Sequence, residues 1–250
     1  FRRLPTATKG ELSKCIQEEE VLRRGSGRLT LTGGTSGRPL RFLTDLEAGR
    51  AGLASKLFFD GWLGVYPHER KFSVSRAWAD ETFKDRFLLN EQGASYASIL
   101  ENPGAVYRKL SNFRPRLISG AAALRVLADF MAENGLQTEG WVKAVSPWGI
   151  PLLPEHVASI SKAFTGEIYD RYGSSELTGV AAQQCHEKTG LHVNTDLCLI
   201  EVVKNGEPCA DGERGRLVVT NLRNRATPFI RYEQGDTAIR GPECACGRRL

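Results

Sequence analysis

The spacing of apolar residues changes near residue 190, and this change constrains the fold more than any other feature of the sequence. Before it, strand-like runs alternate with amphipathic helical segments such as 121–135 and 154–164. Alternation of this kind is typical of α/β layers around a largely parallel sheet. After it, the runs 198–204 and 214–222 follow each other, with an Asn-Gly turn between them that favours an antiparallel hairpin. We therefore predict two architectures within one chain.

The predicted fold class is α/β, with layered α/β subdomains, a mostly parallel sheet and a small antiparallel β-barrel. The α/β part takes residues 1–189 and the barrel-like part takes residues 190–250. Thr44 and Glu47 form a predicted capping box at the start of a long helix through Leu57. Further strands are predicted at 28–32, 41–44, 71–75, 228–232 and 237–240, and helices at 9–20, 121–135 and 154–164. The segments 114–120, 141–149 and 167–173 each begin as a predicted strand and run into a turn or loop.

Composition excludes several classes of protein. With 250 residues, 41% of them hydrophobic, the chain can bury a large core. It contains no run of eighteen apolar residues, so no membrane span is predicted. The net charge of +5 and the lack of nucleic-acid-binding motifs argue against nucleic acid as a partner, whereas a small phosphate-rich anion suits this charge. The six cysteines are irregularly spaced, so we predict no disulfides and a reducing compartment, the cytoplasm.

Residues 31–39, LTGGTSGRP, follow a predicted strand and combine glycine with hydroxyl side chains. Glycine lets backbone N–H groups approach a phosphate closely, and hydroxyls add donors. The loop is not a Walker motif, which needs Gly-Lys-Ser/Thr where Gly37-Arg38-Pro39 stands, and it does not match the dinucleotide pattern G-x-G-x-x-G. The alternative is a plain turn between strands, because these residues dominate turns for backbone reasons.

Two further polar stretches follow predicted strands. Residues 172–179, YGSSELTG, bring an aromatic ring, two hydroxyls and a carboxylate to a tight turn. Such a set can stack on a base, contact phosphate and hold Mg²⁺. The alternative is a strand-end turn before a helix capped by Ser174 or Ser175. Residues 228–239, PFIRYEQGDTAI, can present Asp236 to ribose hydroxyls, and the alternative there is a simple hairpin turn.

In this order the three stretches resemble motifs of adenylate-forming enzymes, the acyl- and aryl-coenzyme A ligases and their relatives. TGGTSGRP is similar to their phosphate loop, YGSSE to their Tyr-Gly-Ser-Thr-Glu motif, and RLVVTNL with PFIRYEQGD to their segment ending in Tyr-Arg-Thr-Gly-Asp. LPTATK, GLHVNTD and CACGR most resemble the phenylacetate–coenzyme A ligase family and its capsule-biosynthesis relatives. The chain departs at Arg38, where lysine is usual, and at Ser36 and Ser175, where threonine is usual. Each replacement keeps a charge or a hydroxyl, although arginine and lysine differ in geometry.

The resemblance implies a domain organisation. Members of the superfamily have a large N-terminal domain of two α/β subdomains and a small β-barrel, followed by a mobile C-terminal domain. This sequence stops where that C-terminal domain should begin, so we expect the domain and its catalytic lysine to be absent. We also expect some N-terminal helices to be missing.

The resemblance also implies a reaction, in which a substrate carboxylate attacks the α-phosphate of ATP to give an acyl-adenylate and pyrophosphate. Such chemistry depends on positioning and charge neutralisation. Glu176 is expected to hold Mg²⁺, Ser175 to contact the α-phosphate and Asp236 to bind the ribose. The residues implied for catalysis are Glu176, Ser175 and Arg38. The residues implied for binding ATP or AMP are Thr32, Gly33, Gly34, Thr35, Ser36 and Gly37 at the phosphates, and Gly149, Ile150, Pro151 and Tyr172 around the adenine. Gly173, Ser174 and Asp236 are implied to complete the nucleotide site.

The resemblance specifies the substrate acid and the acyl acceptor less directly than it specifies the reaction. An aryl or arylacetic acid is predicted, with Trp78, Phe83 and Trp148 as candidates for an aromatic pocket. The alternative is that they belong to the core, where scattered aromatic residues more often lie. Coenzyme A is the predicted acceptor. The alternatives are transfer to an amine, a carrier protein or a reductase, and a non-catalytic protein that only binds nucleotide or acid. A homodimer is compatible with each of these.

Four residues form a candidate zinc site: Cys185, His192, Cys244 and Cys246. Cys244 and Cys246 are too close for a mutual disulfide but well spaced to hold one metal. Three thiolates and an imidazole are a common structural Zn²⁺ set. His186 is the rival nitrogen ligand, but GLHV at His192 resembles the family more. The alternative is four unrelated residues whose thiols are buried as small hydrophobes.

Overall fold

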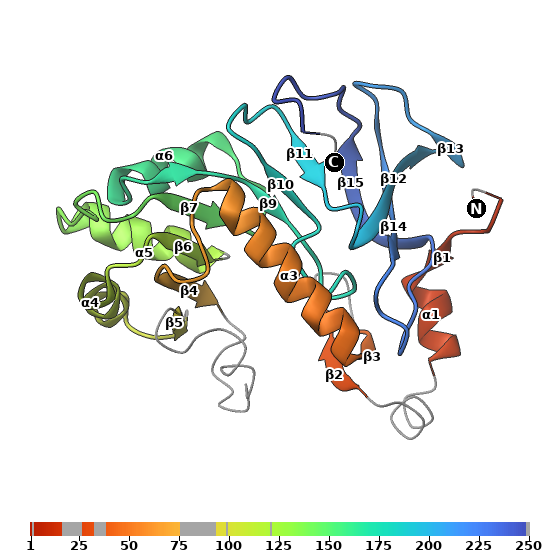
Figure 1. Ribbon diagram of the computed structural model, residues 1–250, viewed down its shortest axis with the longest axis horizontal. Helices are drawn as coiled ribbons and strands as arrows, with labels where there is room; N and C mark the ends of the chain where they lie inside the picture. The colour runs from red at the N-terminus through yellow and green to blue at the C-terminus, as the bar shows by residue number, and fades with distance from the viewer. Residues whose placement is uncertain are drawn as a thin grey trace. The chain divides into compact units, whose positions relative to one another are not determined.

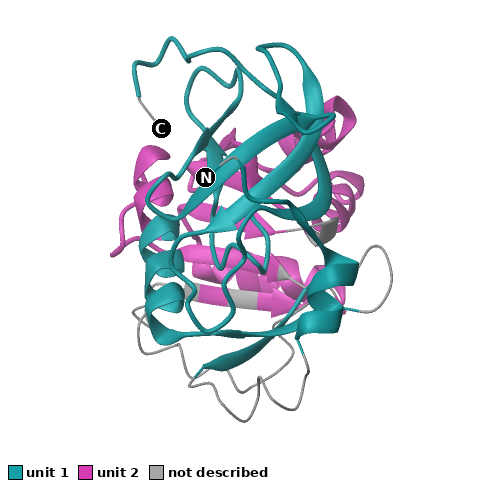
Figure 2. Ribbon diagram, turned by 90° about the vertical axis from the view of Figure 1, so that its right-hand side faces the viewer, with its two compact units in different colours: residues 1–56, 173–250 teal, residues 57–172 magenta. Residues whose placement is uncertain are grey.

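The computed structural model describes residues 1, 3–16, 27–32, 39–75, 94–98, 100–120 and 122–248. These residues form two compact units, one of residues 1–56 and 173–250 and one of residues 57–172 (Figure 2). The predicted domain boundary at residue 189 does not coincide with the boundaries of these units. The division into domains stays a prediction. Among the described residues, no helix has the length and apolar character that crossing a membrane requires.

The unit of residues 57–172 is built on a five-stranded parallel sheet (Figure 1). The strand order is β5-β4-β6-β7-β8, and each neighbouring pair is parallel, which confirms the predicted parallel sheet. The elements of this unit are β4 (Lys71–Ser75), β5 (Ala94–Ser98), α4 (Pro103–Phe113), β6 (Leu117–Gly120), α5 (Ala122–Glu133), β7 (Ala144–Pro147), α6 (Pro154–Ala163), β8 (Glu167–Ile168) and β9 (Arg171–Tyr172).

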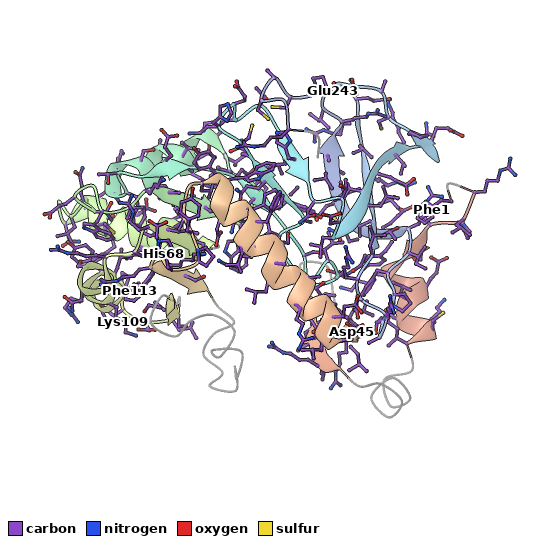
Figure 3. The ribbon with its side chains drawn as sticks, in the orientation of Figure 1. Phe1, Asp45, His68, Lys109, Phe113 and Glu243 are labelled. Atoms are coloured by element: carbon purple, nitrogen blue, oxygen red, sulfur yellow. The ribbon has the colours of Figure 1, made fainter. Side chains whose placement is uncertain are left out.

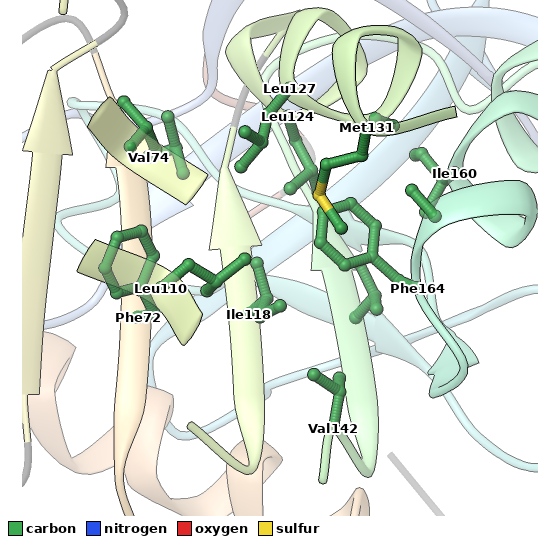
Figure 4. Packing of buried hydrophobic residues seen from close by; sticks show 14 of the residues in the cluster. Phe72, Val74, Leu110, Ile118, Leu124, Leu127, Met131, Val142, Ile160 and Phe164 are labelled. Carbon is green, nitrogen blue, oxygen red and sulfur yellow. The ribbon is translucent and has the colours of Figure 1, made fainter. Parts of the chain in front are cut away.

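The two central strands of this sheet, β6 and β7, are buried along their whole length. Ile118 faces the apolar cluster drawn in Figure 4, to which α4, α5 and α6 contribute. Leu117 and Ala144 face the opposite side, where Leu63 and Val65 complete a second cluster. Parallel strands covered on both faces need continuous apolar runs, which explains the sequence of these strands.

The unit of residues 1–56 and 173–250 carries a mostly antiparallel sheet with the order β1-β15-β14-β12-β13. Asn205 and Gly206, both with positive φ, connect β12 to β13, as their sequence predicts. The strands at the two ends of this order, β1 and β13, do not pair with each other among the described residues. The closed β-barrel therefore stays a prediction. The elements are β1 (Ala7–Thr8), α1 (Lys9–Cys15), β2 (Arg28–Leu31), β3 (Arg41–Thr44), the first part of α3 (Leu46–Trp62), β10 (Ala182–Gln184), β11 (Leu191–Val193), β12 (Cys198–Lys204), β13 (Glu207–Pro208), β14 (Arg214–Asn221) and β15 (Tyr232–Ile239).

Strand β15 contains a bulge where the sequence predicts a break between two strands. Residues 234–236 lie opposite Leu217 of β14 alone, because the register shifts there. Gly235 inside the bulge has a φ of +101°, a conformation that glycine adopts without strain. The alternative of a simple hairpin turn at 228–239 is therefore wrong. Bulges re-aim the side chains next to them, which here are Gln234 and Asp236.

The start of α3 differs from the prediction. The backbone N–H of Ala48 donates to Asp45 Oδ1 at 2.8 Å, so Asp45, labelled in Figure 3, caps the helix in place of a box formed by Thr44 and Glu47. Thr44 belongs to β3, and its hydroxyl lies 2.9 Å from the hydroxyl of Thr30 on β2. The hydroxyl of Thr44 therefore pairs with Thr30 across the two strands, and it does not cap the helix as predicted.

Gly52 of α3 lies directly against the backbone of the turn that contains Thr178. A Cβ atom on Gly52 would overlap the carbonyl oxygen of Thr178, whereas one on Gly49 would have no atom within 4 Å. We expect Gly52→Ala to lower the free energy of unfolding by about 1–3 kcal/mol, because the added methyl group forces two backbones apart. Gly49→Ala is the matched control and should be neutral or stabilising, since alanine is the better helix former. Urea unfolding of both variants tests this, and equal midpoints would contradict it.

Candidate functional site

Residues 174–179 form a tight turn that contains Glu176. The N–H groups of Leu177 and Thr178 donate to the carbonyl oxygens of Ser174 and Ser175, each at 3.2 Å. No helix follows these residues, so the alternative of a helix capped by Ser174 or Ser175 is wrong. The turn instead leaves Ser174 and Ser175 half-buried at the surface of the unit.

Asn221, the last residue of β14, holds this turn in place. Its Nδ2 donates to the carbonyl oxygen of Glu176 at 2.7 Å and to Thr178 Oγ1 at 3.3 Å. Its Oδ1 accepts from the backbone N–H groups of Arg223 and Asn224, at 2.8 and 3.0 Å. The sequence analysis missed this role because the two partners are 45 residues apart, and no local pattern links them.

The Glu176 carboxylate lies in an environment that disfavours its charge. The residue is only 6% exposed. Burial raises the pKa of Glu176 above its usual range and the charge of Asp236 raises it further, while a hydrogen bond with Ser174 lowers it. Burial together with the charge of Glu176 also raises the pKa of Tyr232 to about 12. Glu176 and Asp236 thus place two carboxylates near each other, and a bound cation would relieve both the burial and the repulsion.

A chain of hydrogen-bonding groups links this turn to the bulge of β15. Ser174 Oγ lies 3.3 Å from Gln234 Oε1, and Gln234 Nε2 donates to Asp236 Oδ2 at 2.9 Å. The single hydroxyl proton of Ser174 is donated either to Gln234 or to Glu176. The structure therefore brings together three predicted residues, Ser174, Glu176 and Asp236. It adds Gln234, whose only signal in the sequence is its place beside the Gly-Asp pair.

Thr32 closes the base of the predicted phosphate loop. The backbone N–H of Leu40 donates to Thr32 Oγ1 at 2.9 Å, and the N–H of Thr32 donates to the Leu40 carbonyl at 3.0 Å. These bonds hold the two ends of the predicted loop together. The remaining residues of the predicted loop, Gly33, Gly34, Thr35, Ser36, Gly37 and Arg38, lie outside the described residues, and their roles stay predictions.

The residues predicted around the adenine belong to the other unit. Gly149, Ile150 and Pro151 follow β7 at the carboxyl end of the parallel sheet, and Gly149 has a φ of +74°. Ligands of open α/β sheets bind at this end of the strands. Tyr172, at the end of β9, and Trp148 are half-buried. Trp78 and Phe83, the other candidates for an aromatic pocket, lie outside the described residues.

Arg171, which precedes Tyr172 in the sequence, forms a buried ion pair with Asp60. Its Nη2 lies 2.9 Å from Asp60 Oδ1, and Lys71 Nζ lies 2.9 Å from Asp60 Oδ2. The Asp60 side chain is fully buried, and its carboxylate contacts two cations that have little contact with water. Asp60 and Arg171 are 111 residues apart, which explains why the sequence analysis missed the pair.

Four side chains of the unit of residues 1–56 and 173–250 meet at one place: Cys185, His192, Cys244 and Cys246. Their ligand atoms all lie within 4.8 Å of one another. The sulfurs of Cys185 and Cys244 are 3.6 Å apart, and the sulfur of Cys246 is 3.4 Å from His192 Nε2. The rival ligand, His186, is exposed, and its Nε2 lies 3.1 Å from Glu187 Oε1. We call the four residues the thiol–imidazole cluster.

The cysteines differ in their surroundings. Hydrogen bonds from the N–H of Cys246 and the hydroxyl of Thr189 lower the pKa of Cys244 to about 6, whereas burial raises the pKa of Cys185. Outside the cluster, burial raises the pKa of Cys198 to about 12, which makes it a small apolar residue of the core. None of the six cysteines is disulfide-bonded in this structure.

Comparison with known proteins identifies relatives of the chain, although no protein-family model matches it. Over 150 residues it is 31% identical to the phenylacetate-coenzyme A ligase of Thermus thermophilus, a stretch that covers 56% of this chain and 33% of that protein. Over 248 residues it is 23% identical to protein CapK of Staphylococcus aureus, covering 95% of this chain and 53% of CapK. The chain thus spans at most about half the length of these two curated relatives.

The fold has a counterpart among solved structures. A crystal structure of 2-hydroxyisobutyryl-CoA ligase in complex with 2-HIB-AMP and CoA matches 99% of this chain and 56% of that chain, with a TM-score of 0.80 at 21% identity. In fold the chain is thus similar to an adenylate-forming enzyme. In sequence it is similar to phenylacetate-coenzyme A ligases and to protein CapK.

Proposed function

We propose that this protein activates a carboxylic acid with ATP, and that the acid is an aryl or arylacetic acid. A carboxylate oxygen of the substrate attacks the α-phosphorus of ATP. The bond from this phosphorus to the oxygen that bridges to the β-phosphate breaks, pyrophosphate leaves, and an acyl-adenylate remains. The observation that carries the proposal is the buried Glu176 carboxylate beside Asp236, in a turn whose sequence resembles the Tyr-Gly-Ser-Thr-Glu motif.

Each residue of the site then has a distinct task. Glu176 is the ligand for Mg²⁺, which supplies neutralisation of the phosphate charges when it is bound. Ser175 donates its hydroxyl proton to the α-phosphate, and Asp236 accepts hydrogen bonds from the ribose hydroxyls. Ser174 and Gln234 position these two carboxylates through their contacts with Glu176 and Asp236. The loop of residues 32–38 binds the β- and γ-phosphates, and Tyr172 with residues 149–151 encloses the adenine.

Coenzyme A is the proposed acceptor in a second step. Its sulfur attacks the carbonyl carbon of the adenylate, the bond to the AMP oxygen breaks, and the thiol proton passes to solvent. The coenzyme A ligases among the similar proteins support this choice. Transfer to an amine, a carrier protein or a reductase would leave the first step unchanged, so the acceptor needs its own measurement.

Trapping of the adenylate tests the first step directly. The protein is incubated with Mg-ATP and hydroxylamine, with benzoic, phenylacetic or short aliphatic acids, and both the hydroxamate and the pyrophosphate are measured. We expect both products with one aryl class and neither product without acid. Addition of coenzyme A in place of hydroxylamine should give the thioester.

The possible outcomes separate the hypotheses. Hydroxamate without thioester would retain the first step and exclude coenzyme A as the acceptor. ATP binding in calorimetry without hydroxamate from any acid of the panel would favour a binding protein over an enzyme. Lack of ATP binding would contradict the proposed function as a whole.

A further inference from the structure

We propose that the thiol–imidazole cluster is a structural zinc site, in which Cys185, His192, Cys244 and Cys246 complete a tetrahedral shell. The proposal rests on the arrangement of these four side chains and is independent of the proposed adenylation. All four ligands come from the unit of residues 1–56 and 173–250, so the site is complete within one unit.

The spacing of the ligand atoms fits zinc. Zn–S bonds of about 2.3 Å in a tetrahedral shell place two sulfurs about 3.8 Å apart, and a sulfur and a nitrogen slightly closer. The sulfurs of Cys185 and Cys244 are 3.6 Å apart, and the sulfur of Cys246 and His192 Nε2 are 3.4 Å apart. Two edges of the shell are therefore already formed. A disulfide would need sulfurs about 2.05 Å apart, well below the observed separation of Cys185 and Cys244.

The local backbone is shaped to present these ligands. Cys185 directly follows β10, and His192 lies in β11, which pairs with β10 in antiparallel register. Cys244 and Cys246 lie on a turn closed by a hydrogen bond from the Gly247 N–H to the Cys244 carbonyl, at 3.3 Å. Gly247 has a φ of +72°, a conformation that favours glycine.

Hydrogen-bond donors lie next to the sulfurs of Cys244 and Cys246. The backbone N–H of Arg248 donates to the sulfur of Cys246 at 3.5 Å, and Thr189 Oγ1 lies 3.7 Å from the sulfur of Cys244. Donors of this kind orient metal-bound thiolates and offset their negative charge. Cys185 and His192 are buried, so their ligand atoms are shielded from water.

The ligand set selects the metal and the role. Thiolates with one imidazole favour zinc over Mg²⁺ and Ca²⁺, which prefer oxygen ligands. Four protein ligands leave no open position for a substrate, so the role is structural and not catalytic. Zinc would join the β10–β11 hairpin to the chain segment that follows β15. Figure 3 labels Glu243, the residue just before that segment's first ligand.

Metal analysis of the purified protein tests this proposal. After incubation with zinc and removal of the excess, we expect about one zinc ion per chain, and a lower melting temperature after treatment with a strong chelator. Cys246→Ala should reduce the zinc content to below about a tenth of the wild-type value, because three ligands hold the ion far less tightly. Cys209→Ala is the matched control, since Cys209 is buried but lies outside the cluster, and it should retain the zinc.

Cobalt(II) provides a readout that does not depend on any variant. In the wild-type protein it should give the intense visible bands of a tetrahedral site and thiolate-to-cobalt charge-transfer absorption. A folded wild-type protein without stoichiometric zinc and without these bands would overturn the proposal. Zinc content that is equal in Cys246→Ala and wild type would also overturn it.

Discussion

Replacement of Glu176 by glutamine is expected to reduce acid-dependent pyrophosphate release about 100-fold or more. The substitution keeps the shape of the side chain but removes the negative charge proposed to hold Mg²⁺, and loss of one charge-stabilising group commonly has an effect of this size. Pyrophosphate release at saturating Mg-ATP with the preferred acid is the measurement. Activity near the wild-type value would contradict the assignment of Glu176.

The same variant should be at least as stable as the wild type in the absence of ligands. Burial raises the pKa of Glu176, so its folded-state pKa lies above its unfolded-state pKa. The carboxyl group therefore stabilises the fold less as the pH rises from the usual range of a glutamate through the raised value. Glutamine cannot ionise, so the melting temperature of Glu176→Gln should equal or exceed that of the wild type at pH 8. The difference should shrink at pH 4, where the wild-type carboxyl group is protonated in the folded state.

This stability measurement separates two explanations of lost activity. Inactivity with a retained or raised melting temperature supports a role in catalysis. Inactivity with a strongly lowered melting temperature would show that Glu176 holds the turn together, contrary to our proposal. The main-chain contact of Glu176 with Asn221 persists in the variant, because Asn221 binds the backbone carbonyl and not the carboxylate.

Replacement of Asp60 by asparagine is expected to lower the free energy of unfolding by about 3–5 kcal/mol, the effect typical of breaking a buried ion pair from one side. Asp60 is fully buried and lies 2.9 Å from both Lys71 Nζ and Arg171 Nη2. Asparagine has nearly the same size, but it removes the buried negative charge that both of these cations contact. Urea unfolding of the ligand-free protein measures the loss.

An exposed ion pair provides the control for Asp60. Lys204 Nζ and Glu213 Oε1 are 2.8 Å apart, as close as the buried pair, but both side chains are open to solvent. Glu213→Gln should therefore leave the urea midpoint nearly unchanged, because water screens such pairs. If Asp60→Asn and Glu213→Gln lose similar amounts of unfolding free energy, burial does not explain the contribution of the Asp60 ion pairs to stability.

Elements with a regular apolar pattern are predictable from the sequence to within a few residues. The bounds of β3 and β4 agree with the predicted strands 41–44 and 71–75, and α6 begins at Pro154 as predicted. The prediction fails where a side chain has a competing partner. Thr44 pairs with Thr30 across the β2–β3 hairpin, so Asp45 caps α3 in its place. At 234–236 the Gln-Gly-Asp sequence suggests a turn, yet pairing with β14 carries the strand through as a bulge.

The sequence by itself determined the alternating pattern of the parallel layer, the Asn-Gly turn, and the set of polar residues from which Ser174, Glu176 and Asp236 come. It also marked Cys244 and Cys246 as a pair, because their spacing is local. Only the tertiary structure decided which residues meet. It joins Cys185 to Cys244 over 59 residues, Asn221 to the Glu176 backbone over 45, and Asp60 to Arg171 over 111.

The physical reason is that turn and strand preferences depend on a few neighbouring residues, whereas these contacts depend on strand register and on packing across the whole unit. A shift of β14 by one residue would turn the Asn221 side chain to the other face of the sheet and remove its contact with Glu176.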